Sequence, residues 1–311
     1  MDINRIYNAT VSGKSVLLLT ICGFVLIRLG WNFEDIAVAG SVVIRILMAL
    51  LLMAFNRIFG LIRSHSVLPS VLYLLAMAID FPDGGGFIPC FVSFCILLSY
   101  LFLFHSYRDA RSEVQSLNIS IILTLCSLFW SPVLFFFPVF WYGFYLLGSW
   151  NGRIIPASVL GYVSVYGIIF AYCVYGGCIS DFESYLPCTS DLFAFGFSFP
   201  TVGELIFFVL IFFAYVLTGI ELYISDFKET TRAALSLRCL YLHSFFVAVF
   251  FLFRPVDVVY RTLIMFIPLS VVIGMVFART SSTAVKYFLF FLILTSAVIA
   301  GIVSCTVPHG I

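Results

Sequence analysis

Acidic and basic side chains gather in the polar turns between apolar segments of this chain, and their types suit the handling of a phosphate group. Arginine binds phosphate through two parallel hydrogen bonds, and a carboxylate can take a proton from an acceptor hydroxyl. Glu34 and Asp35 are among the carboxylates that could take this role. The side chains expected to bind the substrate are Arg45, Asp80, Asp83, Arg254, Asp257 and Arg261.

The same residues also have a structural explanation. Polar turns of any membrane protein carry acidic residues, and Arg254 and Arg261 can simply mark the ends of apolar segments. Arg45 is different because it lies well inside an apolar segment, where inserting a charged side chain costs roughly 2.5 to 3.5 kcal/mol. Such a residue tends to face a polar partner or a hydrated cavity. We therefore expect Arg45 to have a functional or a structurally paired role.

Other catalytic patterns are missing from the sequence. The four histidines are scattered, with no His-x-x-x-His or His-Glu spacing, which disfavours a zinc protease. No Gly-x-Ser-x-Gly turn occurs, and the run from Asp83 through three glycines indicates only a turn. We expect no metal and no cofactor.

Two of the nine cysteines differ from the others in their surroundings. Six are expected inside apolar segments, where cysteine behaves as a small apolar residue. Cys178 and Cys188 instead flank a polar loop, and a disulfide between them would staple that loop in an oxidising compartment. Cys173 is a competing partner.

The elements that position these residues must be membrane helices. Only 31 of the 311 residues are Lys, Arg, Asp or Glu, or 10%, whereas a soluble domain has roughly 25%. Hydrophobic residues make up 63% of the chain, and the charges cannot cover them in water. A formal net charge of +1, with no run of Lys or Arg, excludes a nucleic-acid partner. The sequence therefore predicts an all-α, polytopic transmembrane bundle.

Windows of roughly 17 to 25 residues define the expected spans. The first is expected to be a retained span rather than a cleaved signal, because no small-residue cleavage site follows it. The spans are 15–31, 36–59, 66–79, 87–104, 118–150, 156–175, 202–223, 235–253, 258–277 and 287–305.

The segment 118–150 is too long for one crossing. As a single helix it would reach about 50 Å, against a hydrocarbon core of about 30 Å. We expect a hairpin that breaks at Ser131 and Pro132, because proline removes a helix donor and clashes with the preceding turn. The first arm, 118–130, covers only about 20 Å, so it either crosses or is re-entrant.

The distribution of charge gives the topology. With a cytoplasmic amino terminus and the hairpin, inner loops hold 12 of the 16 basic residues, as the positive-inside rule requires. This arrangement gives about eleven passes in a multi-pass protein. We expect residues 1–311 to form a single integral membrane domain, with a weak internal boundary in the outer loop 176–200.

The stretch from Val42 to Arg153 carries a resemblance to known proteins. Its motifs begin with the segment from Arg45 to Arg57, followed by Leu68-Pro69 through Tyr73 and by Asp80. They continue with His105-Ser-Tyr-Arg108, the segment from Leu125 to Pro132, and Trp150-Asn-Gly-Arg153. The stretch resembles a multispanning inner-membrane family of Bacteroidota that has no established activity.

In wider outline, the same stretch is similar to membrane glycosyltransferases of the GT-C type, which use polyprenyl-phosphate sugars. The resemblance implies a GT-C-like first half, a cell inner-membrane location and a membrane lipid such as a polyprenyl phosphate as partner. The family's catalytic carboxylate would match Glu34 or Asp35. This chain departs from the pattern, because its first outer loop is only a few residues long. We also expect no carboxyl-terminal soluble domain.

Three functions remain open from the sequence. The first is an envelope-biogenesis protein, catalytic or a degenerate relative of a glycosyltransferase, that binds a polyprenyl phosphate or lipid-linked glycan at the outer face. The second is a non-catalytic scaffold subunit that holds protein partners of an envelope assembly or secretion complex. The third is a transporter, which ranks last because paired broken helices and an inverted repeat are not visible.

Overall fold

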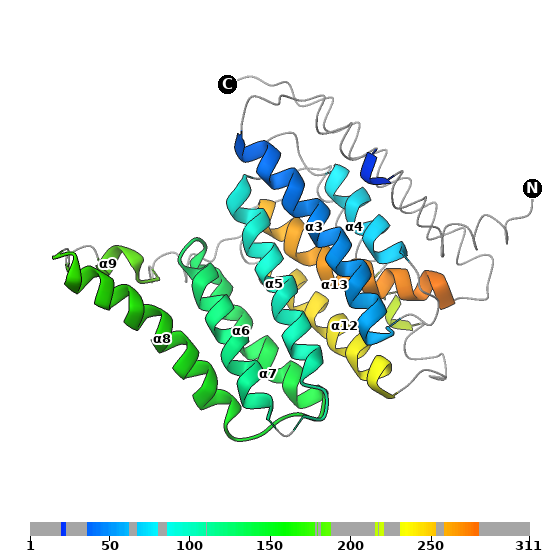
Figure 1. Ribbon diagram of the computed structural model, residues 1–311. Helices are drawn as coiled ribbons and strands as arrows, with labels where there is room; N and C mark the ends of the chain where they lie inside the picture. Colours follow the sequence, from blue (N-terminus) through cyan, green and yellow to red (C-terminus); the bar gives the residue numbers. More distant parts are fainter. Residues whose placement is uncertain are drawn as a thin grey trace, which may run out of the picture. The chain divides into compact units, whose positions relative to one another are not determined.

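In the ranges it describes, the structure, a computed structural model, consists of helices joined by turns and short loops (Figure 1). These ranges are residues 20–22, 36–61, 67–79, 86–109, 111–177, 179, 182–187, 215–216, 218–220, 231–252 and 258–279. Their elements are α3 (Ile36–Phe59), α4 (Leu68–Ile79), α5 (Phe87–His105), α6 (Ser112–Ser127), η1 (Ser131–Phe136), α7 (Phe137–Leu146), α8 (Ile154–Tyr175), α9 (Phe182–Tyr185), α12 (Thr231–Leu252) and α13 (Val258–Arg279).

Four of the described helices are long and apolar enough to cross a membrane. Their apolar spans are Ala39–Phe59 in α3, Phe87–His105 in α5, Ile154–Tyr175 in α8 and Thr231–Phe250 in α12. The all-α membrane-protein class expected from the composition therefore agrees with the structure.

The chain divides into two compact units. Residues 1–90 and 197–311 form the first, and residues 91–196 form the second.

In the first unit, α4 packs against both α3 and α13, and α12 packs against α13. The buried positions of α3 recur every three or four residues, so they lie on one face of the helix, the inward face, and pack against the neighbouring helices. Its buried residues are Ser41, Val42, Arg45, Met48, Ala49, Leu52, Phe55, Asn56 and Phe59. The Tyr73 hydroxyl of α4 bonds to the Met48 sulfur at 3.2 Å, which fixes the register of α3 and α4.

In the second unit, α6 and α8 lie side by side in the same direction (Figure 1). The hydroxyl of Ser116 bonds to the Ile154 carbonyl at 2.9 Å and to the Ser158 hydroxyl at 2.9 Å. Further along both helices, the hydroxyls of Ser127 and Tyr166 are 3.0 Å apart. The contacts advance together along the two helices, so the chain between them must return as a hairpin.

The break predicted at Ser131 and Pro132 is confirmed. Helix α6 ends at Ser127, Trp130 is extended, and Pro132 lies in the first turn of the 3₁₀ helix η1, which continues into α7. Pro132 fits there because the first turn of a helix needs no backbone donor at that position.

Helix α6 begins at Ser112, six residues before the predicted start of its segment. The added turns carry the polar residues Ser112, Glu113 and Ser116. Because these residues are polar, hydropathy predicts a loop there. They are helical because Glu113 lies favourably in the first turn, beside the positive end of the helix dipole. The buried serines bond across to α8 and its preceding turn.

Close approach of α6 and α8 depends on small residues. Ser112, Ser116, Ser120 and Thr124 recur at every fourth position of α6, and Ser120 donates to the Ser158 carbonyl. A Cβ added at Gly161 of α8 would lie 2.8 Å from the Ser120 Cβ and 3.0 Å from the Leu117 carbonyl oxygen. Small residues and hydroxyls of this kind let membrane helices pack with their backbones close together.

The substitution Gly161→Ala should destabilise the protein by about 1 to 3 kcal/mol, because the new methyl group overpacks the interface. Gly167→Ala on the same helix is the matched control, since nothing lies within 4 Å of a Cβ at that position. Thermal unfolding in detergent measures both. A Gly161→Ala protein as stable as the Gly167→Ala protein would show that α6 and α8 do not approach this closely.

Candidate functional site

The most deeply placed charge among the described residues is Arg45, on the inward face of α3. Its exposed fraction is 1%, and it is among the largest fully buried side chains. It lies nine residues after Ile36, about 14 Å along the helix at 1.5 Å per residue. Arg45, for which the sequence predicts a functional or structurally paired role, is therefore enclosed by protein.

The guanidinium of Arg45 faces the start of α5. Its Nε donates to the Cys90 sulfur at 3.4 Å, and Cys90 is itself fully buried. The two helices come close nearby, because a Cβ added at Gly40 would lie 3.0 Å from a ring carbon of Phe87. Glycine at position 40 thus allows α3 and the start of α5 to hold Arg45 and Cys90 together.

The chemistry of this position is that of anion binding. A guanidinium carries five N–H donors in a planar fork and stays charged in proteins. A thiol is a weak hydrogen-bond acceptor, and it orients the Nε edge without supplying a negative charge. Among the described residues, Arg45 is therefore the side chain best suited to a phosphate or a carboxylate inside the helical core.

The other predicted site residues are not placed beside Arg45 by the described part of the chain. Arg261 belongs to the first turn of α13, where the structure describes the backbone. The remaining ones lie outside the described residues, and so do both cysteines of the predicted disulfide. These are Glu34, Asp35, Asp80, Asp83, Arg254, Asp257, Cys178 and Cys188.

The competing partner for the disulfide is unpaired. Cys173 is a buried free thiol near the end of α8. Both loop cysteines lie outside the described residues, so the Cys178–Cys188 bond stays a prediction.

A buried histidine, His243, lies in α12 of the first unit, although the four histidines are scattered along the sequence. His243 is 1% exposed, and its Nε2 lies 3.9 Å from the Cys239 sulfur one helical turn earlier. The spacing of four residues was a visible signal for this contact, because it places both side chains on one helix face. No group of three metal-binding side chains forms among the described residues.

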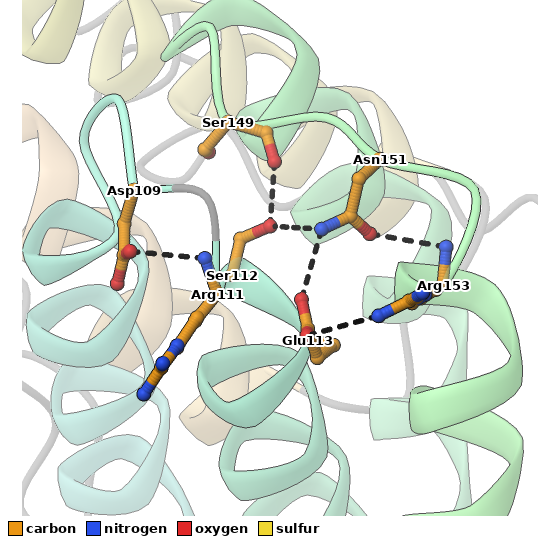
Figure 2. A network of polar contacts seen from close by, with 7 residues as sticks. All are labelled: Asp109, Arg111, Ser112, Glu113, Ser149, Asn151 and Arg153. Carbon is orange, nitrogen blue, oxygen red and sulfur yellow. Dashed lines mark hydrogen bonds and ion pairs between the residues drawn. The ribbon is translucent and has the colours of Figure 1, made fainter.

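A polar network joins the starts of α6 and α8 in the second unit (Figure 2). The Ser112 hydroxyl donates to the Ser149 carbonyl at 2.6 Å. The Asn151 side-chain amide donates to the Ser112 hydroxyl at 3.1 Å and to Glu113 Oε2 at 2.9 Å. The network ties the turn before α8 to the first turn of α6.

Glu113 is held in its ionised form by this network. Hydrogen bonds from its own backbone and from Asn151, together with the charge of Arg153, hold the pKa of the Glu113 carboxyl below its usual range. Arg153 Nη1 lies 4.0 Å from Glu113 Oε1, and the Arg153 backbone N–H donates to Asn151 at 3.0 Å. Sequence reasoning treated these residues as loop and missed the network, although Asn151 and Arg153 lie within one of the quoted motifs.

No protein-family model, curated protein or solved structure matches this chain. The side-chain geometry therefore carries the functional argument.

Replacing Glu113 by glutamine should lower the thermal unfolding temperature at neutral pH by no more than a few degrees. Since the folded pKa is lowered, the carboxylate stabilises the fold above the unfolded pKa of about 4.3. This contribution is lost as the pH falls through the lowered pKa, so wild type and Glu113→Gln should converge in acid. Unfolding in detergent from about pH 7 to about pH 3 measures the difference.

Asn151→Ala is the comparison for this measurement, because it removes an uncharged donor and should lose stability at neutral and at acid pH. A difference between wild type and Glu113→Gln that stays constant over the same range would contradict the assigned charge state of Glu113.

Proposed function

We propose that this chain is a multi-pass inner-membrane protein of envelope biogenesis that binds a lipid phosphate at the outer face, and that Arg45 is the phosphate-binding group. The lipid is a polyprenyl phosphate or a lipid-linked glycan. The observation that supports this proposal most directly is the burial of Arg45 in an apolar helix of the first unit.

The free-energy cost of this placement favours a functional reading. A buried charge costs several kcal/mol unless it is paired and hydrogen-bonded, and an ionisable residue inside a membrane helix is by default a candidate for a ligand or ion pathway. Leucine or methionine would fill the same space on α3 without that cost. A guanidinium adds a planar, charged fork of donors that fits a phosphate, beside the contacts that it makes within the protein.

Arg45 lies in the outer half of α3 in the proposed topology, so the proposed phosphate enters the helical core from the outer face. In the proposed topology α3 starts at the outer face, and Arg45 lies closer to Ile36 than to Phe59. The proposed architecture has about eleven passes, a cytoplasmic amino terminus and a GT-C-like first half. Glu34 or Asp35 is the proposed base, with Arg254 and Arg261 on the phosphate and Asp80, Asp83 and Asp257 beside them.

A non-catalytic scaffold is the second candidate, and the surface of α8 favours it. Only 28% of this apolar span is buried within the chain. Ile168, Tyr172 and Tyr175 are 71%, 74% and 95% exposed, respectively, so partner helices could pack against them. This candidate requires no phosphate-binding role for Arg45.

The variant Arg45→Gln should bind polyprenyl phosphate about tenfold or more weakly than wild type, because it loses charge-assisted hydrogen bonds worth about 1.5 to 3 kcal/mol. The affinity of Arg45→Lys should lie between those of wild type and Arg45→Gln, since lysine keeps the charge but lacks the planar fork. Native mass spectrometry of the purified protein in nanodiscs, titrated with short-chain polyprenyl phosphate, gives the ratio of the variant and wild-type dissociation constants.

Arg57→Gln is the matched control, because Arg57 lies in the last turn of the same helix and is exposed. This variant should bind as wild type does. If Arg45→Gln is folded and inserted but binds the lipid unchanged, the phosphate-binding role is wrong. If it also complements a deletion strain, the scaffold candidate is favoured.

A further inference from the structure

The starts and ends of four helices meet at one end of the second unit. The Ser106 hydroxyl, just after α5, lies 3.3 Å from the Ser149 hydroxyl that follows α7. The Ser112 and Asn151 bonds described above add the starts of α6 and α8 to the same place (Figure 2). These turns are therefore held in fixed positions relative to one another.

Three arginines at this end are exposed: Arg108, Arg111 and Arg153. The side chain of Arg153 is 84% exposed, whereas that of Glu113 is 27% exposed. Figure 2 shows the Arg111 guanidinium directed away from the polar network. We call Arg108, Arg111 and Arg153 the arginine surface.

The nearby carboxylates are engaged with the protein itself. Asp109 Oδ1 accepts the backbone N–H of Arg111 at 2.9 Å, and Glu113 accepts the Asn151 amide. Both acids are only partly exposed. Because negative charge is turned towards internal donors and guanidinium groups are turned to the surroundings, this end presents positive charge outwards.

Arg108 adopts a backbone conformation that arginine rarely takes. Its φ of 53° lies in the left-handed region, where a glycine would meet no steric penalty. Its guanidinium carbon lies 5.4 Å from the centre of the neighbouring Tyr107 ring. An unusual backbone conformation of this kind is an observation that motivates a role for the Arg108 side chain.

Exposed aromatic side chains accompany the arginine surface. Trp150 is 44% exposed and lies between two residues of the network, Ser149 and Asn151. Tyr142 and Tyr145, at the end of α7, are 48% and 64% exposed, and their rings stack at 6.1 Å. Tryptophan and tyrosine concentrate where hydrocarbon meets headgroups, because their rings are apolar and carry a polar atom.

We propose that the arginine surface binds the phosphate groups of anionic phospholipids at the membrane surface, with Trp150, Tyr142 and Tyr145 at the boundary of the hydrocarbon. Guanidinium groups match phosphate oxygens in charge and geometry. The exposed aromatic side chains favour a lipid surface over a free anion as the ligand, because only a lipid surface places an apolar phase beside the phosphates. This binding holds one end of the hairpin at the bilayer surface, and it does not depend on the role of Arg45.

The test compares two double variants of the full-length protein with equal loss of charge. Arg108→Gln/Arg111→Gln removes two members of the arginine surface and leaves the Arg153–Glu113 pair intact. Arg57→Gln/Arg238→Gln removes two exposed arginines of the first unit. Native mass spectrometry of detergent-solubilised protein titrated with phosphatidylglycerol or phosphatidylcholine gives the affinities, with inorganic phosphate as a further arm.

We expect wild type and the control double variant to prefer phosphatidylglycerol. The Arg108/Arg111 double variant should lose roughly tenfold or more in affinity for phosphatidylglycerol and little for phosphatidylcholine. Unfolding temperatures check that each variant is folded. Arg108→Lys/Arg111→Lys, which keeps the charges, should recover much of the binding.

Three results would overturn the proposal. One is an equal loss in both double variants, which would show a diffuse effect of net charge. Another is equal affinity of wild type for phosphatidylglycerol and phosphatidylcholine, which would favour a protein partner for the arginine surface. The third is inorganic phosphate competing as strongly as the lipid headgroup, which would identify a site for a free anion.

Discussion

The structure depends on one constraint: polar groups held inside an apolar, membrane-like core must find their partners within the protein. Each unsatisfied polar group in hydrocarbon costs several kcal/mol, and a charge costs more. Arg45 is the sharpest case in the first unit, where α3 holds a guanidinium against the Cys90 sulfur at 1% exposure. The proposed function adds a lipid phosphate to the contacts that this guanidinium makes within the protein.

The second unit meets the same constraint with hydroxyls. Ser116 and Ser158 of α6 and α8 bond to each other and to the same carbonyl, that of Ile154, while the Trp141 indole N–H donates to Ser158 at 2.9 Å. These side chains are small enough to let the helices approach. Their hydrogen bonds satisfy the serine hydroxyls and the Ile154 backbone carbonyl. The hairpin between α6 and α8 is thus anchored by specific hydrogen bonds as well as by apolar packing.

Hydropathy predicted the fold well where helices are apolar throughout. The expected span 36–59 coincides with α3, and the expected 156–175 differs from α8 by two residues at its start. The break before α7 was predictable because proline at position 132 cannot continue a helix. The first turns of α6 were not predictable in this way, because they are polar and become helical through contacts that only the folded chain supplies.

The candidate site was predictable only in its outline. An arginine inside an apolar segment identified Arg45 as special, but Cys90 is 45 residues away and nothing in the sequence pairs the two. The network of Ser112, Glu113 and Asn151 was missed for the same reason, since its members come from two separate turns. Proximity of this kind follows from packing, whereas span positions follow from local composition.

The most direct test of the central claim is an electron cryo-microscopy structure of the full-length protein in nanodiscs that contain a polyprenyl phosphate. The account predicts phosphate density within hydrogen-bonding distance of the Arg45 guanidinium, reached from the Ile36 end of α3. A guanidinium bonded only to protein side chains, with no lipid phosphate beside it at saturating ligand, would contradict the account.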